Sequence, residues 1–323
     1  MNLKPEKLAK FLLPFAISFF ILLSANAQKV AERPAPRAHH TGVYDATRKA
    51  FLIYGGFNYF KAQPNSRRVG DIWSWDGNAW SRIANTDVRK IVAPLVYDSK
   101  RGRTLLFGGS EDSGSDGKLR VLEGSEWRVL TDSPEMARDD ASLVYDSKRD
   151  RLVLFGGIDN GKFFGDTWEF DGKAWKRVAT TGPSPRSAGA MAYDQKRGVT
   201  VLYGGFYPAV PLGDTWEWNG KKWKQVKTDG FGARSFAAAV YDEQNKMTVL
   251  FGGQDDKQFS GETWGWNGEK WRRLSETGPP PRIQFTMGYD SLRKRTVLFG
   301  GFGNPPEYLN DLWEFDGSQW AKK

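Results

Sequence analysis

Residues 241–253 read YDEQNKMTVLFGG, in which a Tyr-Asp pair is followed eleven residues later by a Gly pair that ends an apolar run. The same arrangement occurs six times. The Gly pairs are Gly55-Gly56, Gly108-Gly109, Gly156-Gly157, Gly204-Gly205, Gly252-Gly253 and Gly300-Gly301, and by subtraction they lie 53, 48, 48, 48 and 48 residues apart. A register kept through six units indicates an internal repeat, and no linker or second domain interrupts it.

Each unit predicts four strands. The first leads into Tyr-Asp, and the second is a buried apolar run that the Gly pair ends. The third alternates, as in residues 214–218 (DTWEW), and an Asp-Gly or Asn-Gly hairpin signal then leads to the fourth. A tryptophan begins the last strand of each unit: Trp80, Trp127, Trp175, Trp223, Trp271 and Trp320. We therefore predict an all-β fold, a six-bladed β-propeller of four-stranded antiparallel blades.

The Gly pair after an apolar strand, the aromatic third strand and the tryptophan of the fourth strand together resemble the kelch repeat. The resemblance covers residues 37–323 and extends to the central domain of galactose oxidase. The repeat units are expected at about 37–83, 90–130, 138–178, 186–226, 234–274 and 282–323. WD-type propellers are the alternative, but their period is shorter and no Gly-His partner is present. Unit 2 departs most, because residues 118–120 (KLR) stand where the others have acid-x-Trp.

Composition excludes several classes of protein. The chain has 323 residues, a formal net charge of +9, two His and no Cys. Without cysteine there is no disulfide, thiolate metal site, cysteine nucleophile or lipoprotein anchor. The aromatic content of 14% excludes wholesale disorder. No metal site and no cofactor are expected.

Residues 1–27 combine three lysines, an apolar run from Phe11 to Leu23 and an Ala-x-Ala ending. This arrangement predicts a secretory signal peptide, which leaves residues 28–323 as a single propeller. An uncleaved membrane anchor is the alternative, but the run is short for a span. We expect an exported, monomeric protein, periplasmic or extracellular, with no membrane anchor after cleavage and no nucleic-acid partner.

A cation stands seven residues before the tyrosine of each Tyr-Asp pair: Arg37, Lys90, Arg138, Arg186, Arg234 and Arg282. Ring closure would place all six around one mouth of the channel. One interpretation pairs each with the acid that opens a third strand, because Arg–carboxylate forks suit buried contacts. The other is a basic rim that attracts an anionic ligand. Ligand-binding kelch propellers are similar in using arginine on this face. In unit 2 the acid is replaced by Lys118, so at least one cation there is expected to lack a local partner.

Further candidates lie in the loops and at positions that break the repeat. Loop aromatics on the same face, among them Tyr59, Phe164, Tyr207 and Tyr308, would stack on sugar rings, clamp a peptide or cap their own blades. The polar residues His39, Asp140 and Gln284 occupy one column of the repeat and would converge on a ligand. Adjacent residues on a strand point to opposite faces, so His39 and His40 are not expected to chelate one metal.

Catalytic templates are mostly missing from the sequence. It contains no Gly-x-Ser-x-Gly and no His-Glu-x-x-His. Kelch oxidases need a Cys–Tyr crosslink, which this chain cannot form, and no Glu/Asp/His cluster resembles that of the iron-dependent kelch specifier proteins. We therefore predict a non-catalytic binding module with a basic mouth, whose ligand is an anionic saccharide or an acidic peptide of a protein partner. The alternative is an enzyme resembling sialic acid mutarotase, a carbohydrate epimerase, with His39 or Asp140 assisting ring opening of an acidic sugar.

Overall fold

The computed structural model describes residues 32–323, except 61–62 and 228–230 and the side chains of 58–66. The signal peptide predicted at 1–27 and the side chain of Tyr59 therefore lie outside the described residues. No helix among the described residues is long and apolar enough to cross a membrane.

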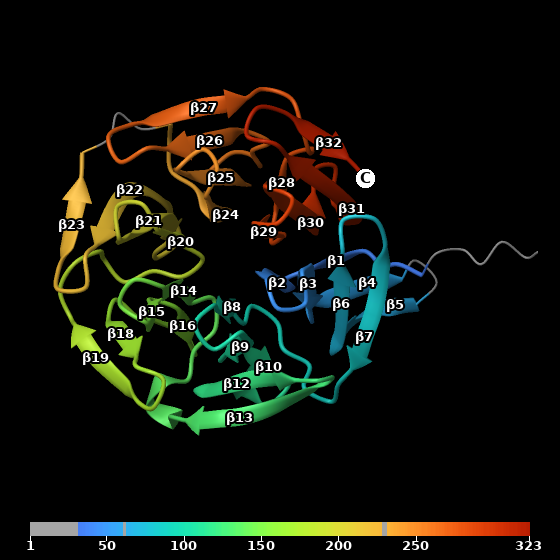
Figure 1. The fold of residues 1–323 in the computed structure, drawn as a ribbon, viewed down its shortest axis with the longest axis horizontal. Coiled ribbons are helices and arrows are strands. Elements are labelled where there is room, and N and C mark those ends of the chain that lie inside the picture. The colour runs from blue at the N-terminus through green and yellow to red at the C-terminus, as the bar shows by residue number, and fades with distance from the viewer. Residues whose placement is uncertain (1–31, 61–62, 228–230) are drawn as a thin grey trace, which may run out of the picture. The chain divides into compact units, whose positions relative to one another are not determined.

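Residues 32–323 form a ring of six four-stranded antiparallel sheets, which confirms the predicted propeller (Figure 1). The first three blades are β2 (Thr41–Asp45), β3 (Ala50–Tyr54), β6 (Asp71–Trp75) and β7 (Trp80–Asn85); β8 (Leu95–Asp98), β9 (Arg103–Phe107), β12 (Lys118–Glu123) and β13 (Glu126–Asp132); and β14 (Ser142–Asp146), β15 (Arg151–Phe155), β18 (Thr167–Phe170) and β19 (Trp175–Ala179). The last three are β20 (Ala190–Asp194), β21 (Val199–Phe206), β22 (Pro211–Trp218) and β23 (Trp223–Val226); β24 (Ser235–Asp242), β25 (Met247–Gln254), β26 (Thr263–Trp266) and β27 (Trp271–Ser275); and β29 (Thr286–Asp290), β30 (Arg295–Gly303), β31 (Glu307–Phe315) and β32 (Trp320–Lys322).

Shorter strands lie on one face of the ring. Most of them form where the chain passes between the second and third strands of a blade, and two of them precede the first strand, in blades 1 and 6. The shorter strands are β1 (Arg37–Ala38), β4 (Phe57–Phe60), β5 (Gln63–Arg68), β10 (Ser110–Glu111), β11 (Gly114–Ser115), β16 (Ile158–Asp159), β17 (Lys162–Phe163) and β28 (Arg282–Ile283). One 3-10 turn, η1 (Pro134–Met136), precedes the third blade. We call the face that carries these hairpins the hairpin face.

The ring closes between the first and last blades without any exchange of strands. All four strands of the last blade come from residues 286–322. Contacts between the two blades close the ring: the indole Nε1 of Trp75 donates to Glu314 at 3.2 Å, the His40 ring lies edge-on to Phe299, and the backbone N–H of His39 donates to the carbonyl of Gln284 at 3.1 Å.

The aspartates of the Tyr-Asp pairs fix the turns between the first and second strands. In each blade this carboxylate accepts the backbone N–H three residues on, as Asp290 does from Arg293 at 2.9 Å. The same residue holds the turn through its own side chain, which is the role the sequence predicts. The Arg293 side chain returns to the carboxylate at 2.7 Å, so this charge is neutralised within the turn.

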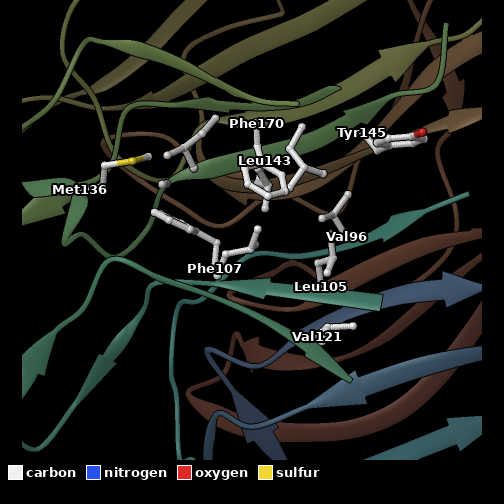
Figure 2. Close-up of a cluster of buried hydrophobic side chains, with 12 residues drawn as sticks. Val96, Leu105, Phe107, Val121, Met136, Leu143, Tyr145 and Phe170 are labelled. Carbon is white, nitrogen blue, oxygen red and sulfur yellow. The ribbon is translucent and has the colours of Figure 1, made fainter. Parts of the chain in front are cut away.

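The hydrophobic core is divided into six clusters, one between each pair of neighbouring blades. Figure 2 shows the cluster between the second and third blades, in which Phe107 and Val121 face Leu143 and Phe170. Because the apolar side chains pack between blades, no common core fills the centre of the ring. The first strands of the blades surround this centre, which is therefore free to hold a channel (Figure 1).

Candidate binding site at the channel mouth

The six cations predicted around one mouth are buried and engaged with the protein itself. Arg282 shows the arrangement: its Nη1 and Nη2 lie 2.7 and 2.8 Å from the two carboxylate oxygens of Asp311, and Nη1 also donates to the carbonyl of Gly300 at 2.9 Å. Arg37 and Arg186 form the same two-bond pair with Asp71 and Asp214, and Arg138 and Arg234 are ion-paired with Asp166 and Glu262. The pairs tie the start of each unit to its third strand, and a ligand that used these cations would have to break them.

Blade 2 keeps this arrangement with different residues. Lys90 lies 3.0 Å from Asp116 and 3.5 Å from Glu111, and Lys118 lies 3.8 Å from Asp132, so the expectation that a cation there lacks a local partner is wrong. The acid has moved two residues toward the N-terminus from the position that Lys118 occupies. Arg120 takes the place of the usual tryptophan and binds Asp116 in turn, much as Trp313 donates to Asp311 at 2.7 Å in blade 6.

Six non-glycine residues with left-handed backbone surround the channel at the hairpin face. They are His39, Val92, Asp140, Ala188, Phe236 and Gln284, with φ between 49° and 57°. Non-glycine residues seldom adopt this conformation, and a surrounding structure must hold them in it. Five backbone hydrogen bonds between neighbouring blades do so. In each, the N–H of one ring residue donates to the carbonyl of the equivalent residue in the preceding blade, at 3.0–3.3 Å, and the last blade precedes the first, so that His39 donates to Gln284. We call this the mouth ring.

The side chains of the mouth ring line a cavity of about 250 Å³ in the channel. The cavity is bounded on its inner side by Leu95, Leu143, Met191 and Met287, which also line a second cavity toward the opposite face. The structure therefore brings His39, Asp140 and Gln284 into one cavity, as their shared column indicates. Phe236 belongs to the same ring, and sequence reasoning missed it although its place in the repeat was available.

Burial strongly perturbs the two ionisable groups of the mouth ring. Desolvation lowers the pKa of His39 to about 4, so its imidazole is neutral at pH 7. Burial, together with the negative charge of Asp139, raises the pKa of Asp140 to about 7. Neither the Asp140 carboxylate nor the Gln284 amide makes a side-chain hydrogen bond within the part of the chain that the structure describes. The His39 Nδ1 has no partner there either, but this atom is fully buried and out of reach of a ligand, which leaves the Nε2 side of the ring. The cavity thus holds three polar groups with free hydrogen-bonding capacity.

A second ring of residues, each directly after a Gly pair, lies beside the mouth ring on the hairpin face. It contains Phe57, Ser110, Ile158, Phe206, Gln254 and Phe302, all of them half-buried. The Phe57 ring lies 5.9 Å from that of His39, and the Phe206 ring lies 6.4 Å from that of Phe236. Aromatic side chains therefore flank the polar cavity at its mouth. The position after the Gly pair is the signal that would have found them.

The loop aromatics predicted from sequence lie elsewhere on this face. Phe164 lies under the buried Arg138 guanidinium, with 4.0 Å from the ring centroid to Cζ, in a groove on the outer side of blade 3. Tyr207 is edge-on to Phe163, and Tyr308 is edge-on to Phe302. Their contacts are with neighbouring rings of the hairpin face, and no such residue lines the channel cavity.

The neighbouring residues His39 and His40 have different surroundings. His40 is buried, and its Nε2 lies 3.1 Å from the carbonyl oxygen of Phe299. Burial first, and then the positive charge of Arg37, lower the pKa of His40 to about 3. Among the described residues, no three His, Asp or Glu side chains are grouped so that they could hold a metal ion.

Comparisons with known proteins agree with this architecture. A family model described as KLHDC2/KLHL20/DRC7 Kelch-repeats domain matches residues 95–267, more than half of the chain. A solved structure described as "Structure of YjhT" superposes with a TM-score of 0.71 over 90% of this chain and 99% of that chain, at 14% sequence identity. That identity shows a shared fold alone. No curated protein matches the sequence. On the strength of the family match, the chain belongs to the KLHDC2/KLHL20/DRC7 Kelch-repeats domain family.

Proposed function

We propose that this kelch propeller is an exported binding module that holds a neutral saccharide at the mouth ring. The observation that carries the proposal is the set of three polar groups in the cavity, on His39, Asp140 and Gln284, that have no protein partner among the described residues. Buried polar groups are normally hydrogen-bonded, so groups left free in a cavity are suited to a ligand. The signal-peptide pattern of residues 1–27 supports the export part of the proposal.

The chemistry of the site suits a sugar ring. A pyranose has apolar C–H faces that pack on aromatic rings and hydroxyl groups that both donate and accept hydrogen bonds. Phe57, Phe206 and Phe236 supply the rings at the mouth. The amide of Gln284 offers a donor and an acceptor, and neutral His39 offers its Nε2, because its Nδ1 is fully buried. A cavity of about 250 Å³ is smaller than the pockets that take drug-sized molecules, which favours a single ring inside it.

A neutral sugar fits this cavity better than the anionic one expected from sequence. The anionic expectation depended on free positive charge at the mouth. Each of the six cations has a carboxylate partner, and no cationic side chain lines the cavity. Asp139 and Asp140 are acidic groups at or beside the mouth ring, so the local field disfavours a second carboxylate.

The test is a thermal-shift panel of glucose, galactose, N-acetylglucosamine and galacturonate, followed by variants of the mouth ring. A ligand at about one hundred times its Kd adds about 2.7 kcal/mol of stability. Gln284→Ala is expected to abolish the shift while the protein stays folded, because Ala188 holds the same position with φ of 50°. Val92→Ala, in the same ring, removes no polar group and is the matched control. An unchanged shift in Gln284→Ala, or no shift with any neutral sugar, contradicts the proposal.

Mutarotase-like catalysis is the second candidate, and one observation favours it. A carboxyl whose pKa is close to 7, inside a cavity, is suited to general acid–base catalysis of ring opening. The same preparation can be assayed for accelerated anomerisation of glucose and of galacturonate. Acceleration that is lost in Asp140→Asn, with binding retained, would replace the binding proposal by the enzymatic one.

A further inference from the structure

A groove on the outer side of blade 1 gathers five arginines that the mouth ring does not use. They are Arg33, Arg67, Arg68, Arg82 and Arg89, and the groove has a volume of about 460 Å³. Three segments distant in sequence supply them: the chain before β1, the end of β5, and β7 with the segment that follows it. We call this the arginine groove.

The positive charge of the groove is only partly compensated. Two carboxylates line it, those of Glu32 and Asp71, and Asp71 is taken up by the buried Arg37. Arg68 lies 3.2 Å from Asp112, an almost fully exposed side chain. Arg33, Arg67 and Arg89 are exposed and form no ion pair with any described residue. Three guanidinium groups are therefore available to a ligand.

The fold does not require arginine at these positions. The corresponding groove of blade 3 has Phe163 at the position of Arg68 and Pro185 at the position of Arg89, although Lys162 and Arg177 keep a cation at the positions of Arg67 and Arg82. That groove is nevertheless formed by the same strands. Residues that serve every blade recur in every blade, whereas Arg68 and Arg89 have no cationic counterpart in blade 3. Their accumulation in a single groove calls for a role other than folding.

A segment of the chain itself already occupies part of the groove with a carboxylate. Glu32 Oε1 lies 3.7 Å from Arg82 Nη1, with side-chain exposures of 73% and 42%. Two residues outside the groove hold the backbone of this segment in place, since Asn310 donates to the carbonyl of Pro34 at 3.4 Å and Arg37 donates to that of Ala35 at 3.1 Å. An exposed pair of this length contributes little stability, so it is readily exchanged. The present occupant is thus an irregular polypeptide bearing an acid.

We propose that the arginine groove is a docking site for an acidic polypeptide segment of a partner protein. The carboxylates of the partner would pair with Arg33, Arg67 and Arg89, whose planar guanidinium groups bind carboxylate through two parallel hydrogen bonds. The partner segment lies beside Glu32 and competes with it for Arg82. This site is distinct from the saccharide site of the mouth ring, and neither proposal depends on the other.

The test measures binding of a fluorescein-labelled hexaglutamate peptide to the full-length protein by fluorescence anisotropy. We expect binding that weakens steeply between about 50 mM and about 300 mM salt, because the paired groups are exposed. The triple variant R33Q/R67Q/R89Q is expected to lose about tenfold or more in affinity, since each pair contributes modestly and three are removed. Glu32→Gln removes the competing carboxylate and should strengthen binding about twofold.

The matched control is K162Q/K176Q/R177Q in the groove of blade 3. It removes the same three formal charges from exposed side chains of the corresponding groove. Its peptide affinity should stay within about twofold of the unaltered protein. An equal loss in both triple variants shows non-specific charge attraction and overturns the proposal. So does hexagalacturonate, which carries the same number of carboxylates on a sugar backbone, if it binds as tightly as the peptide.

Discussion

Asp116 neutralises two buried cations at once, since its Oδ2 lies 3.0 Å from Lys90 Nζ and its carboxylate also binds Arg120. In the other blades one acid serves one buried arginine and one indole N–H, as Asp166 serves Arg138 and Trp168. Burial alone would raise the pKa of Asp116, but the hydrogen bond and charge of Arg120 and the charge of Lys90 hold it below its usual value. Blade 2 therefore depends more heavily on a single carboxylate.

Asp116→Asn is expected to destabilise the protein more than Asp166→Asn. Breaking one buried ion pair by removal of a partner costs about 3–5 kcal/mol, and Asp116→Asn leaves two cations without their main acid. The comparison is made from urea midpoints, with Glu276→Gln as an exposed control expected to cost less than about 1 kcal/mol. If the two aspartate variants are equally stable, Glu111, 3.5 Å from Lys90, has taken over the pairing.

The carboxylates that pair with the buried arginines at the start of each unit predict that the protein loses stability at low pH. Burial by itself would raise the pKa of Asp311, but the hydrogen bonds and charge of Arg282 lower it below the usual 3.8. A carboxyl with a lowered pKa in the folded state binds fewer protons there than in the unfolded chain. Its contribution is complete above about pH 4 and is lost as the pH falls through the folded value. Urea midpoints at pH 5 and pH 3 should show a smaller drop for Asp311→Asn than for the unaltered protein, and equal drops would contradict this account.

Asp140 predicts the opposite dependence. Because its pKa is raised to about 7 in the folded state, the folded protein binds the extra proton between about pH 4 and pH 7. Its contribution to stability therefore falls as the pH rises through this range. Asp140→Asn removes the unfavourable charge, and asparagine tolerates the left-handed conformation. We compare the free energy of unfolding of the variant with that of the unaltered protein at two pH values. The difference should favour the variant more at pH 8 than at pH 5, by on the order of 1 kcal/mol for a half-buried group. A difference that is the same at both pH values rules out this assignment.

The Gly pair ends the second strand in blades 1 to 3, as predicted, whereas in blades 4 to 6 the strand continues through it, so that part of the prediction is wrong. Gly56 of blade 1 tests why glycine stands at this position. Its φ is +93°, and a Cβ there would lie 2.6 Å from the carbonyl oxygen of Ala38 and 2.8 Å from the backbone N of His40. Gly161 also has a positive φ, of +80°, but open space around it. Gly161→Ala should cost about 1–2 kcal/mol from backbone strain alone. Gly56→Ala should cost clearly more in urea denaturation, because backbone atoms of the neighbouring segment must also move. Equal costs would mean that conformation and not close approach selects glycine.

Repetition is what made the fold predictable from sequence. The Gly pairs, Tyr-Asp pairs and closing tryptophans identified four strands per unit and six units, and the turn role of residues such as Asp290 followed from its side chain. The shared column of His39, Asp140 and Gln284 likewise placed three cavity residues together, because equal register in a ring means equal height along the channel.

The surroundings of charged groups were less predictable. Whether Arg282 is a free cation or half of a buried fork depends on burial, and the spacing to Asp311 allowed both. Asp116 was missed because the acid in blade 2 is displaced by two residues, which a strict column comparison does not detect. The left-handed backbone of Val92 and Phe236 has no local signal, since neither residue favours it. Backbone hydrogen bonds between blades impose it.

Because of those backbone hydrogen bonds, the backbone shape of the mouth does not depend on which side chains stand around it. At the mouth ring, main-chain atoms make the link at five of the six junctions between neighbouring blades, so the diameter of the opening depends on the number of blades more than on the side chains around it. Histidine, valine, aspartate, alanine, phenylalanine and glutamine already occupy the six positions in this one chain. Each of the six positions therefore accepts different side chains on the same backbone, and single substitutions can change which ligand is preferred without changing the backbone of the mouth.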